Sequence, residues 1–332
     1  MLKLFHNLPS FEYLNRRYGP WVALALGIVG VVYMRRGLGF APVAVGLLML
    51  AWIGAEALRR LAPAASSINS LESVPRWRRL ILPAAGSVVS GLWQDVLFYL
   101  LPLWWASAVL SSWNVAFPLA LTSMALFSCF EDHWRDWVLK RPIVHAAWSA
   151  VVLFATLVPA TALLDIPLRI ALAVSAALAS LAITITVWPR LNLAPTERRL
   201  VAVTITATAA ILLSWSAPTL PPVPVVRIAS GTGTAVQNRS LIGATDTFPE
   251  GTRQVYAWFA IAAPVGYRQK VRVEWHHEGA LAGRALETEV IGGRPEGFRT
   301  WAAHTAPAAG RWQVELRTDS SQLVARESFT VR

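Results

Sequence analysis

The segment Leu212-Leu213-Ser214-Trp215-Ser216-Ala217-Pro218-Thr219-Leu220-Pro221-Pro222-Val223-Pro224 divides the chain into two parts of different character. Before it, one long apolar run follows another, and after it no apolar run is long enough to cross a bilayer. Each proline lacks a backbone N–H and has a fixed φ, so a helix cannot continue through them. The segment therefore predicts a transmembrane helical domain over 1–217, a proline-rich linker over 218–224 and a second domain over 225–332.

The composition indicates that much of the chain does not face water. Hydrophobic residues make up 55% and charged residues only 15% of the 332 residues, whereas a soluble domain usually carries about 25% charged residues. The net charge of +11 comes mainly from arginines placed between apolar runs. This placement is typical of membrane topology signals and not of a nucleic-acid surface, so we expect a lipid bilayer and no nucleic acid as partner.

The apolar runs of the first part predict about seven transmembrane helices, with six crossings as the alternative. Most runs approach the ~20 residues that a helix needs to cross about 30 Å of hydrocarbon. The runs cover 20–34, 40–58, 87–110, 114–130, 143–164, 167–188 and 200–217.

The basic residues between these runs predict the orientation. With the N-terminus inside, most lysines and arginines of 1–217 lie on the inner side, and only Arg35, Arg36 and Arg169 lie on the outer side. Such a bias follows the positive-inside rule. Seven crossings then place 225–332 outside, in the periplasm if the chain lies in a bacterial inner membrane.

Residues 225–332 show the two-residue period of β-strands. Apolar Val271, Val273 and Trp275 alternate with polar side chains, and the same pattern recurs at 255–261, 312–316 and 329–331. Turn signals separate these runs at 278–279, 292–295, 308–310 and 319–321. We expect about seven strands in an all-β immunoglobulin-like sandwich. The glycines of 231–233 are interpreted as a turn, and 241–249 as a loop.

The end of the chain resembles a bacterial domain family of unknown function that lies outside the membrane behind a transmembrane region. The residues that carry the resemblance are Val255-Tyr256…Phe259, Val273-Glu274-Trp275-His276, Phe298-Arg299-Thr300-Trp301, Gly310-Arg311-Trp312-Gln313-Val314-Glu315 and Ser328-Phe329-Thr330-Val331. The family pattern has a histidine two positions before the tryptophan, where this chain has Val273. The resemblance covers about 254–332 and implies a fold and a location, but no activity.

A cluster of carboxylates and histidines near the inner end of the fourth run is a candidate metal or catalytic site. These side chains are metal ligands, and a metal there would suit chemistry at a lipid headgroup. The alternative is a solvated loop whose carboxylates pair with neighbouring basic residues, because the spacing matches no specific metal motif. The members are Glu131, Asp132, His133, Asp136 and His145.

Two further features of the helical domain have a structural and a functional interpretation. Asp95 lies within the third run, where it either bonds to another helix or belongs to a transport pathway. Small residues crowd 171–180 and either allow close packing within the chain or form a docking face.

The second domain carries aromatic and histidine side chains that are candidates for a binding surface. By strand alternation, Tyr256 and Trp258 share the face opposite Phe259, whereas Trp275 and Trp312 belong to the core. Exposed aromatic rings stack on ligands, and histidines titrate or bind metal. The candidates are Tyr256, Trp258, His276, His277, Trp301 and His304.

Taken together, the sequence favours a non-enzymatic accessory or assembly protein that presents its β-domain to a membrane or periplasmic protein or an envelope component. No cofactor or metal motif is found. The alternatives are an enzyme acting on a lipid or lipid-linked substrate at the inner face, and a transporter.

Overall fold

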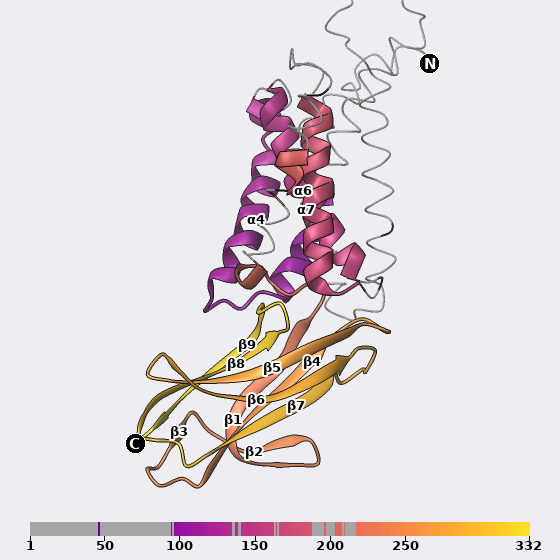
Figure 1. Cartoon of the computed structure of the whole chain (residues 1–332). Helices are drawn as coiled ribbons and strands as arrows, with labels where there is room; N and C mark the ends of the chain where they lie inside the picture. The colour runs from indigo at the N-terminus through magenta and orange to yellow at the C-terminus, as the bar shows by residue number, and fades with distance from the viewer. Residues whose placement is uncertain are drawn as a thin grey trace, which may run out of the picture.

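The computed structural model describes residues 96–134, 137–138, 141–162, 166–187 and 217–332, together with positions 46, 94, 164, 196, 203–207 and 209. The described chain forms a helical part and a β-domain that meet end to end (Figure 1). Several predicted features lie outside the described residues. They are the crossing at 20–34, the crossing at 40–58 apart from Gly46, most of the crossing at 200–217, and the residues Asp95 and Asp136.

The helical part consists of apolar helices joined by short turns. They are the helix Val96–Ala106, η4 (Trp113–Val115), α4 (Ala116–Ser128), α5 (Glu131–Trp134), α6 (Pro142–Ala162) and α7 (Leu168–Val187).

The helix lengths only partly match the predicted crossings. Helices α6 and α7 coincide with the runs 143–164 and 167–188. Among the described helices, only Ile143–Thr161 is long and apolar enough to cross a membrane. Helix α4 has 13 residues and is therefore about 20 Å long, too short to be the single full crossing expected at 114–130. The seven-crossing count therefore stays a prediction.

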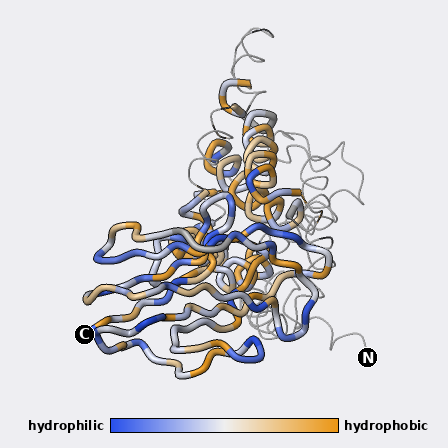
Figure 2. The backbone as a smooth tube through the Cα atoms, turned by 60° about the horizontal axis from the view of Figure 1, so that its bottom comes forward, coloured by the Kyte–Doolittle hydropathy of each residue, from blue (hydrophilic) through white to orange (hydrophobic). Residues whose placement is uncertain are grey.

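Small residues lie on the buried side of α7, and α7 packs against α6. Ala171, Ser175, Ala176 and Ala179 are buried, which confirms that the small residues of 171–180 serve packing within the chain. The other side of α7 exposes the large apolar side chains of Ile170, Val174, Leu178 and Leu181, so the helix is apolar on both sides. Figure 2 shows that hydrophobic residues predominate along much of the helical part. A helix of this kind is typical of a bilayer or of a protein core.

The β-domain contains nine strands in the described residues. They are β1 (Val226–Gln237), β2 (Ser240–Ala244), β3 (Thr247–Phe248), β4 (Gln254–Ala262), β5 (Arg268–His277), β6 (Ala280–Ile291), β7 (Phe298–Thr305), β8 (Gly310–Thr318) and β9 (Leu323–Val331).

The strands form two sheets that pack face to face. One sheet has the order β2-β1-β4-β7 and the other β3-β9-β8-β5-β6. Neighbouring strands are antiparallel except β3 and β9, which are parallel. The inward side chains, among them Phe259, Trp275 and Leu316, are buried. The expected alternation and all four expected turns between strands are thereby confirmed.

Two details of the sequence-based strand assignment were wrong. The residues 241–249 contain most of β2 and all of β3. Both strands are short, and β2 is exposed along most of its length, so neither shows a clear period. The glycines of 231–233 lie inside β1 and not in a turn. A Cβ on Gly233 would come within 2.7 Å of the carbonyl oxygen of Ile242, so glycine here allows β2 to approach β1 closely.

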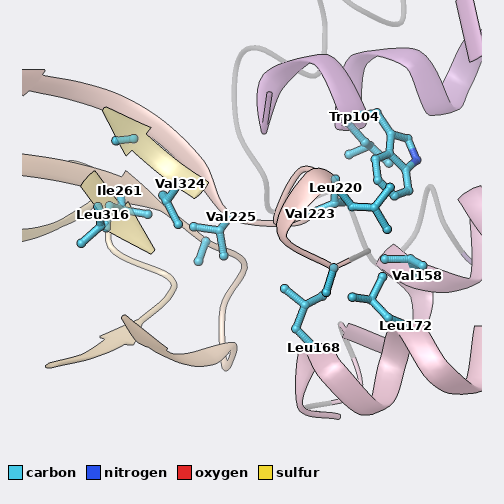
Figure 3. Close-up of a cluster of buried hydrophobic side chains, with 14 of the residues drawn as sticks. Trp104, Val158, Leu168, Leu172, Leu220, Val223, Val225, Ile261, Leu316 and Val324 are labelled. Carbon is cyan, nitrogen blue, oxygen red and sulfur yellow. The ribbon is translucent and has the colours of Figure 1, made fainter. Parts of the chain in front are cut away.

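The proline-rich segment 217–225 lies between the two parts and is buried except at Pro218 and Thr219. A short 3-10 helix, η7 (Ala217–Thr219), begins the segment. The helix expected to end before the prolines lies outside the described residues. Leu220, Val223 and Val225 are each at most 6% exposed. Leu220 and Val223 point toward the helices and Val225 toward the β-domain (Figure 3). The segment is therefore part of the core and not a solvated spacer.

Candidate functional site: the junction and the charged face beside it

A network of charged side chains lies on the outward face of the five-stranded sheet. The alternation that turns Val273 and Trp275 inward turns Glu274 outward. The strand register then places Glu274 opposite Glu315 on β8, and Glu315 opposite Arg326 on β9. We call Arg272, Glu274, His276, Glu315, Arg317 and Arg326 the charged network.

Each carboxylate oxygen of the two glutamates has a guanidinium partner. Arg272 Nε lies 2.7 Å from Glu274 Oε1, and Arg317 Nε lies 3.3 Å from Glu274 Oε2. Arg317 Nη2 lies 2.6 Å from Glu315 Oε2, and Arg326 Nη2 lies 2.7 Å from Glu315 Oε1. The two carboxylates are nearly inaccessible to solvent, so their mutual repulsion is compensated by arginines and not by water.

The arginines also determine the protonation of Glu315. Burial by itself raises the pKa of this carboxyl group, but Arg317 and Arg326 outweigh it through charge and hydrogen bonds. The net effect is a pKa below the ordinary value of glutamate. Glu315 therefore stays ionised at neutral pH and holds the two guanidinium groups in place.

The network contains a group of possible metal ligands, of which the sequence pointed only to His276. In the described part of the chain, only Glu274, His276 and Glu315 bring three such atoms together, within 4.8 Å of one another. The buried His276 Nε2 has no hydrogen-bond partner and lies 3.7 Å from Glu315 Oε2. However, all four carboxylate oxygens are already bound by arginines, and three arginines against two glutamates leave a positive charge. A divalent cation would be repelled, so these residues do not fit a metal site.

The charged network reaches the helical part through Arg326. Its Nη1 donates to the backbone oxygen of Ser111 over 2.8 Å, across a sequence separation of 215 residues. Arg272 and Arg317 donate to Ser321 in the β8–β9 turn, with distances of 2.9 and 2.8 Å. The network therefore fixes the turn that faces the helices.

Two buried amides complete the junction. Asn114 Nδ2 donates to the carbonyl oxygen of Leu323 at 3.3 Å, while Asn114 Oδ1 accepts from Val109 N at 3.0 Å. Gln322 Nε2 donates to the carbonyl oxygens of Leu220 and Pro221, at 3.3 and 3.2 Å. Both amide side chains are fully buried. Because a buried amide is costly to leave unpaired, these bonds define one relative placement of the two parts.

Apolar side chains from both parts surround these amides. Trp104, Val158 and Leu172 of the helices face the segment 217–225 from one side (Figure 3). Ile261, Leu316 and Val324 of the β-domain face it from the other side (Figure 3). The β-domain is therefore fixed on the end of the helices and not tethered by a flexible linker.

Three of the six predicted binding-surface residues lie together on the outward face of the four-stranded sheet. Trp258 on β4 is directly opposite Trp301 on β7, and Tyr256 lies on the same side as Trp258, opposite the buried Phe259. Trp301 is 37% exposed. The indole N–H of Trp258 donates to the backbone oxygen of Arg239 at 2.9 Å. We call Tyr256, Trp258 and Trp301 the aromatic face.

The three histidine candidates lie elsewhere. His277 stacks on Trp312 with ring centroids 4.6 Å apart, and His304 lies 4.7 Å from Trp312 and 5.3 Å from Trp275. Both tryptophans are core residues, as expected. Burial lowers the pKa of His304. These two histidines therefore pack against the core, and His276 belongs to the charged network.

A polar groove of 460 Å³ was not foreseen from the sequence. It lies near the end of the β-domain remote from the helices, between the β5–β6 hairpin and β3. Its lining includes Asp246, Glu278, Arg311, Gln313 and Ser328. The groove could not be predicted from the sequence because it depends on the pairing of β8 with β9, which places Gln313 opposite Ser328.

The candidates of the helical part do not form a site among the described residues. His133 is exposed and packs edge-on against Phe130, with ring centroids 6.5 Å apart, whereas His145 is buried in α6. The side chains of Glu131 and Asp132, like Asp95 and Asp136, fall outside the described part. The convergence of these residues on a metal therefore stays a prediction.

Comparison with known proteins identifies one domain. Residues 268–331 match the model of a family described as "Protein of unknown function (DUF2914)". The match covers β5 to β9 and thus the whole charged network. No curated protein matches the chain. The C-terminal part of this chain thus contains a DUF2914 domain, whose function is unknown.

Proposed function

We propose that this chain is a non-enzymatic accessory or assembly protein of a bacterial inner membrane. Its helical part crosses the membrane about seven times with the N-terminus inside, and its β-domain binds a protein or an envelope component in the periplasm. The observation that carries this proposal is the fixed junction, because it makes the β-domain a rigid platform at the end of apolar helices.

The distribution of charge and apolar surface supports the membrane location. Basic residues between the apolar runs favour an inside N-terminus. Helix α7 exposes Ile170, Val174 and Leu178 to the surroundings. The opposite side of this helix is buried in the protein. Large apolar side chains on its exposed side therefore favour contact with lipid.

The strand order supports an immunoglobulin-like topology. Strands β1, β4 and β7 lie in one sheet, opposite β9, β8 and β5 in the other. This arrangement has the A-B-E and G-F-C order of immunoglobulin-like sandwiches, and such domains commonly bind other proteins. The aromatic face on β4 and β7 is the candidate binding surface, since half-exposed tryptophans are typical of protein interfaces.

Site-specific photo-crosslinking in living cells tests this function. A photoreactive amino acid replaces Trp301, and in a matched variant it replaces Glu287, an exposed residue on the opposite sheet. We expect one or a few defined adducts from position 301 and none from position 287. An absence of adducts at 301, or the same adducts at both positions, would contradict a binding role for the aromatic face.

The location is tested separately by cysteine labelling of intact spheroplasts. In a Cys129→Ser background, Ser240→Cys on the exposed strand β2 should react with a membrane-impermeant maleimide before lysis. A cysteine at position 140, in a loop predicted to lie inside, should react only after lysis.

A further inference from the structure

Two neighbouring turns lie at the end of the β-domain that faces the helices (Figure 1). Ala262, the last residue of β4, pairs with Val226, which follows directly on the buried segment 217–225. Ile291, the last residue of β6, pairs with Arg268 at the start of β5. The β4–β5 turn, 263–267, and the β6–β7 turn, 292–297, are therefore adjacent, and we call them the twin turns.

Glycines join the twin turns into one rigid unit. Gly292 N donates to the carbonyl oxygen of Tyr267 at 2.9 Å, and Gly293 N donates to that of Ala263 at 3.0 Å. A Cβ on Gly292 would lie 1.8 Å from the carbonyl oxygen of Pro264, and Gly293 has a φ of +88°. No other residue type fits this close approach, so the shape of the tip is fixed by its sequence.

The tip of the twin turns presents an apolar and a basic side chain. Val265 is 80% exposed. Arg294 is exposed, its guanidinium lies 5.1 Å from the ring of Phe298, and it forms no ion pair with any described carboxylate. A single exposed valine is ordinary on a protein surface. Its significance therefore depends on what surrounds it.

The helix ends that meet the β-domain expose apolar side chains as well. Trp113 is 84%, Leu110 78% and Leu164 71% exposed. Trp113 is at the level of the junction because its neighbour Asn114 bonds to Leu323 of β9. Tryptophan with leucine at the ends of apolar helices is typical of the boundary between lipid and water. The twin turns lie at the end of the β-domain nearest this boundary.

We infer that the twin turns rest on the outer surface of the bilayer, with Val265 inserted at the level of the headgroups and Arg294 bound to lipid phosphates. This inference depends on the proposed membrane location of the helices. The fixed junction keeps the turns against the surface, and a guanidinium matches the geometry of a phosphate. The β-domain is thus held at two places, by the junction and by lipid.

Lipid-quenching fluorescence tests the inference on the full chain. Single cysteines replace Val265, Leu178 and Ser328 in a Cys129→Ser background, and each is labelled with bimane. Leu178 is an exposed residue of α7, and Ser328 lies at the far end of β9; all three positions are exposed, so the variants should fold. The protein is placed in nanodiscs of phosphatidylethanolamine and phosphatidylglycerol that carry a nitroxide on the headgroup or deep in the acyl chain.

The three positions separate failure of the inference from failure of the proposed function. We expect deep quenching at 178, at least twofold quenching by the headgroup nitroxide at 265, and no quenching at 328. Adding Arg294→Glu should reduce the quenching at 265, whereas Arg294→Lys should preserve it.

If position 265 is as unquenched as 328 while 178 is quenched, the inference is wrong. A spectral shift at 265 that depends on protein concentration and not on lipid would show contact with a second copy and would also overturn it. If 178 is not quenched, the membrane location itself is wrong.

Discussion

Asn114 donates a hydrogen bond from Nδ2 to the carbonyl oxygen of Leu323, 3.3 Å away, and thereby joins η4, the 3-10 helix before α4, to the first residue of β9. The two residues are 209 positions apart in the sequence. The amide is fully buried, and its Oδ1 accepts from Val109 N. One side chain therefore satisfies one backbone group in each part of the protein.

Replacing Asn114 should loosen the junction. Asn114→Leu keeps a similar volume but leaves the Val109 N–H and the Leu323 carbonyl without partners, which should cost about 2 kcal/mol. We expect faster hydrogen exchange at 319–325 and a lower midpoint of thermal unfolding. Leu119→Asn, at a 49% exposed position of α4, is the control for changes that affect the helix alone. Unchanged exchange in Asn114→Leu would show that the bond does not hold the two parts.

Glu315 should stabilise the β-domain in a pH-dependent way. Because its pKa is lowered in the folded state, its contribution is present above the ordinary carboxyl pKa and is lost as the pH falls through the lowered value. Glu315→Gln removes the negative charge that faces two arginines at a buried site and should cost about 3 kcal/mol at pH 7. The difference between the wild type and the variant should shrink below pH 4.5, the ordinary value for glutamate.

Glu296 provides the matched control for Glu315. It also lies 2.7 Å from an arginine, Arg299, but its side chain is 78% exposed. Glu296→Gln should therefore change the free energy of unfolding by less than about 1 kcal/mol. Pulse proteolysis at a series of urea concentrations measures both variants. Equal effects would contradict the importance of burial in the charged network.

His304 should make the β-domain sensitive to mild acid. Burial lowers its pKa below 6.5, so the unfolded chain binds a proton at a higher pH than the folded chain does. Stability should therefore fall as the pH decreases below about 6.5 and level off below the lowered pKa. His304→Phe retains a ring beside Trp275 and Trp312 and should abolish this loss. Urea unfolding between pH 7 and 5 measures it, and an equal loss in His304→Phe would assign the effect to another group.

Gly292 should not tolerate a side chain. Gly292→Ala places a Cβ 1.8 Å from the carbonyl oxygen of Pro264, so the twin turns must separate, at a cost of about 2 kcal/mol or more. Gly283→Ala on β6, where a Cβ meets nothing within 4 Å, should be close to neutral. Thermal unfolding of the two variants compares them directly. If Gly292→Ala is as stable as Gly283→Ala, the twin turns are not a rigid unit.

The interface between α6 and α7 should not accept larger residues. Ala176 is fully buried, and Ala176→Leu should destabilise the helical part by about 1–3 kcal/mol through overpacking. Val174→Leu, at an exposed position two residues away, should have little effect. Differential scanning fluorimetry in detergent measures both. A harmless Ala176→Leu would contradict close packing of these helices.

Much of the β-domain could be predicted from its sequence because the strands with a buried face show it directly. Val271, Val273 and Trp275 alternate with polar residues, and the structure buries these three. Strands β2 and β3 could not be found in this way. Strand β2 is exposed along most of its length, and β3 has two residues, so neither carries an apolar period.

The charged network could be predicted only in part. The sequence identifies Glu274 and Glu315 as outward-facing, but a single strand gives no information on which residues lie across from it. Their burial follows from the pairing of β5 with β8 and of β8 with β9. The same holds for the junction, since prolines predict where a helix ends but not what packs around Leu220 and Val223. Contacts between distant segments are therefore what the sequence left undetermined.

The buried junction fixes the β-domain on the end of the helices. The most direct test is a distance measurement between spin labels at Leu178→Cys in α7 and Ser328→Cys in β9, in a Cys129→Ser background and in nanodiscs. We expect one narrow distance distribution, which Asn114→Leu broadens. A broad distribution in the protein with Asn114 intact would show a tethered, mobile domain and would rule out a fixed junction.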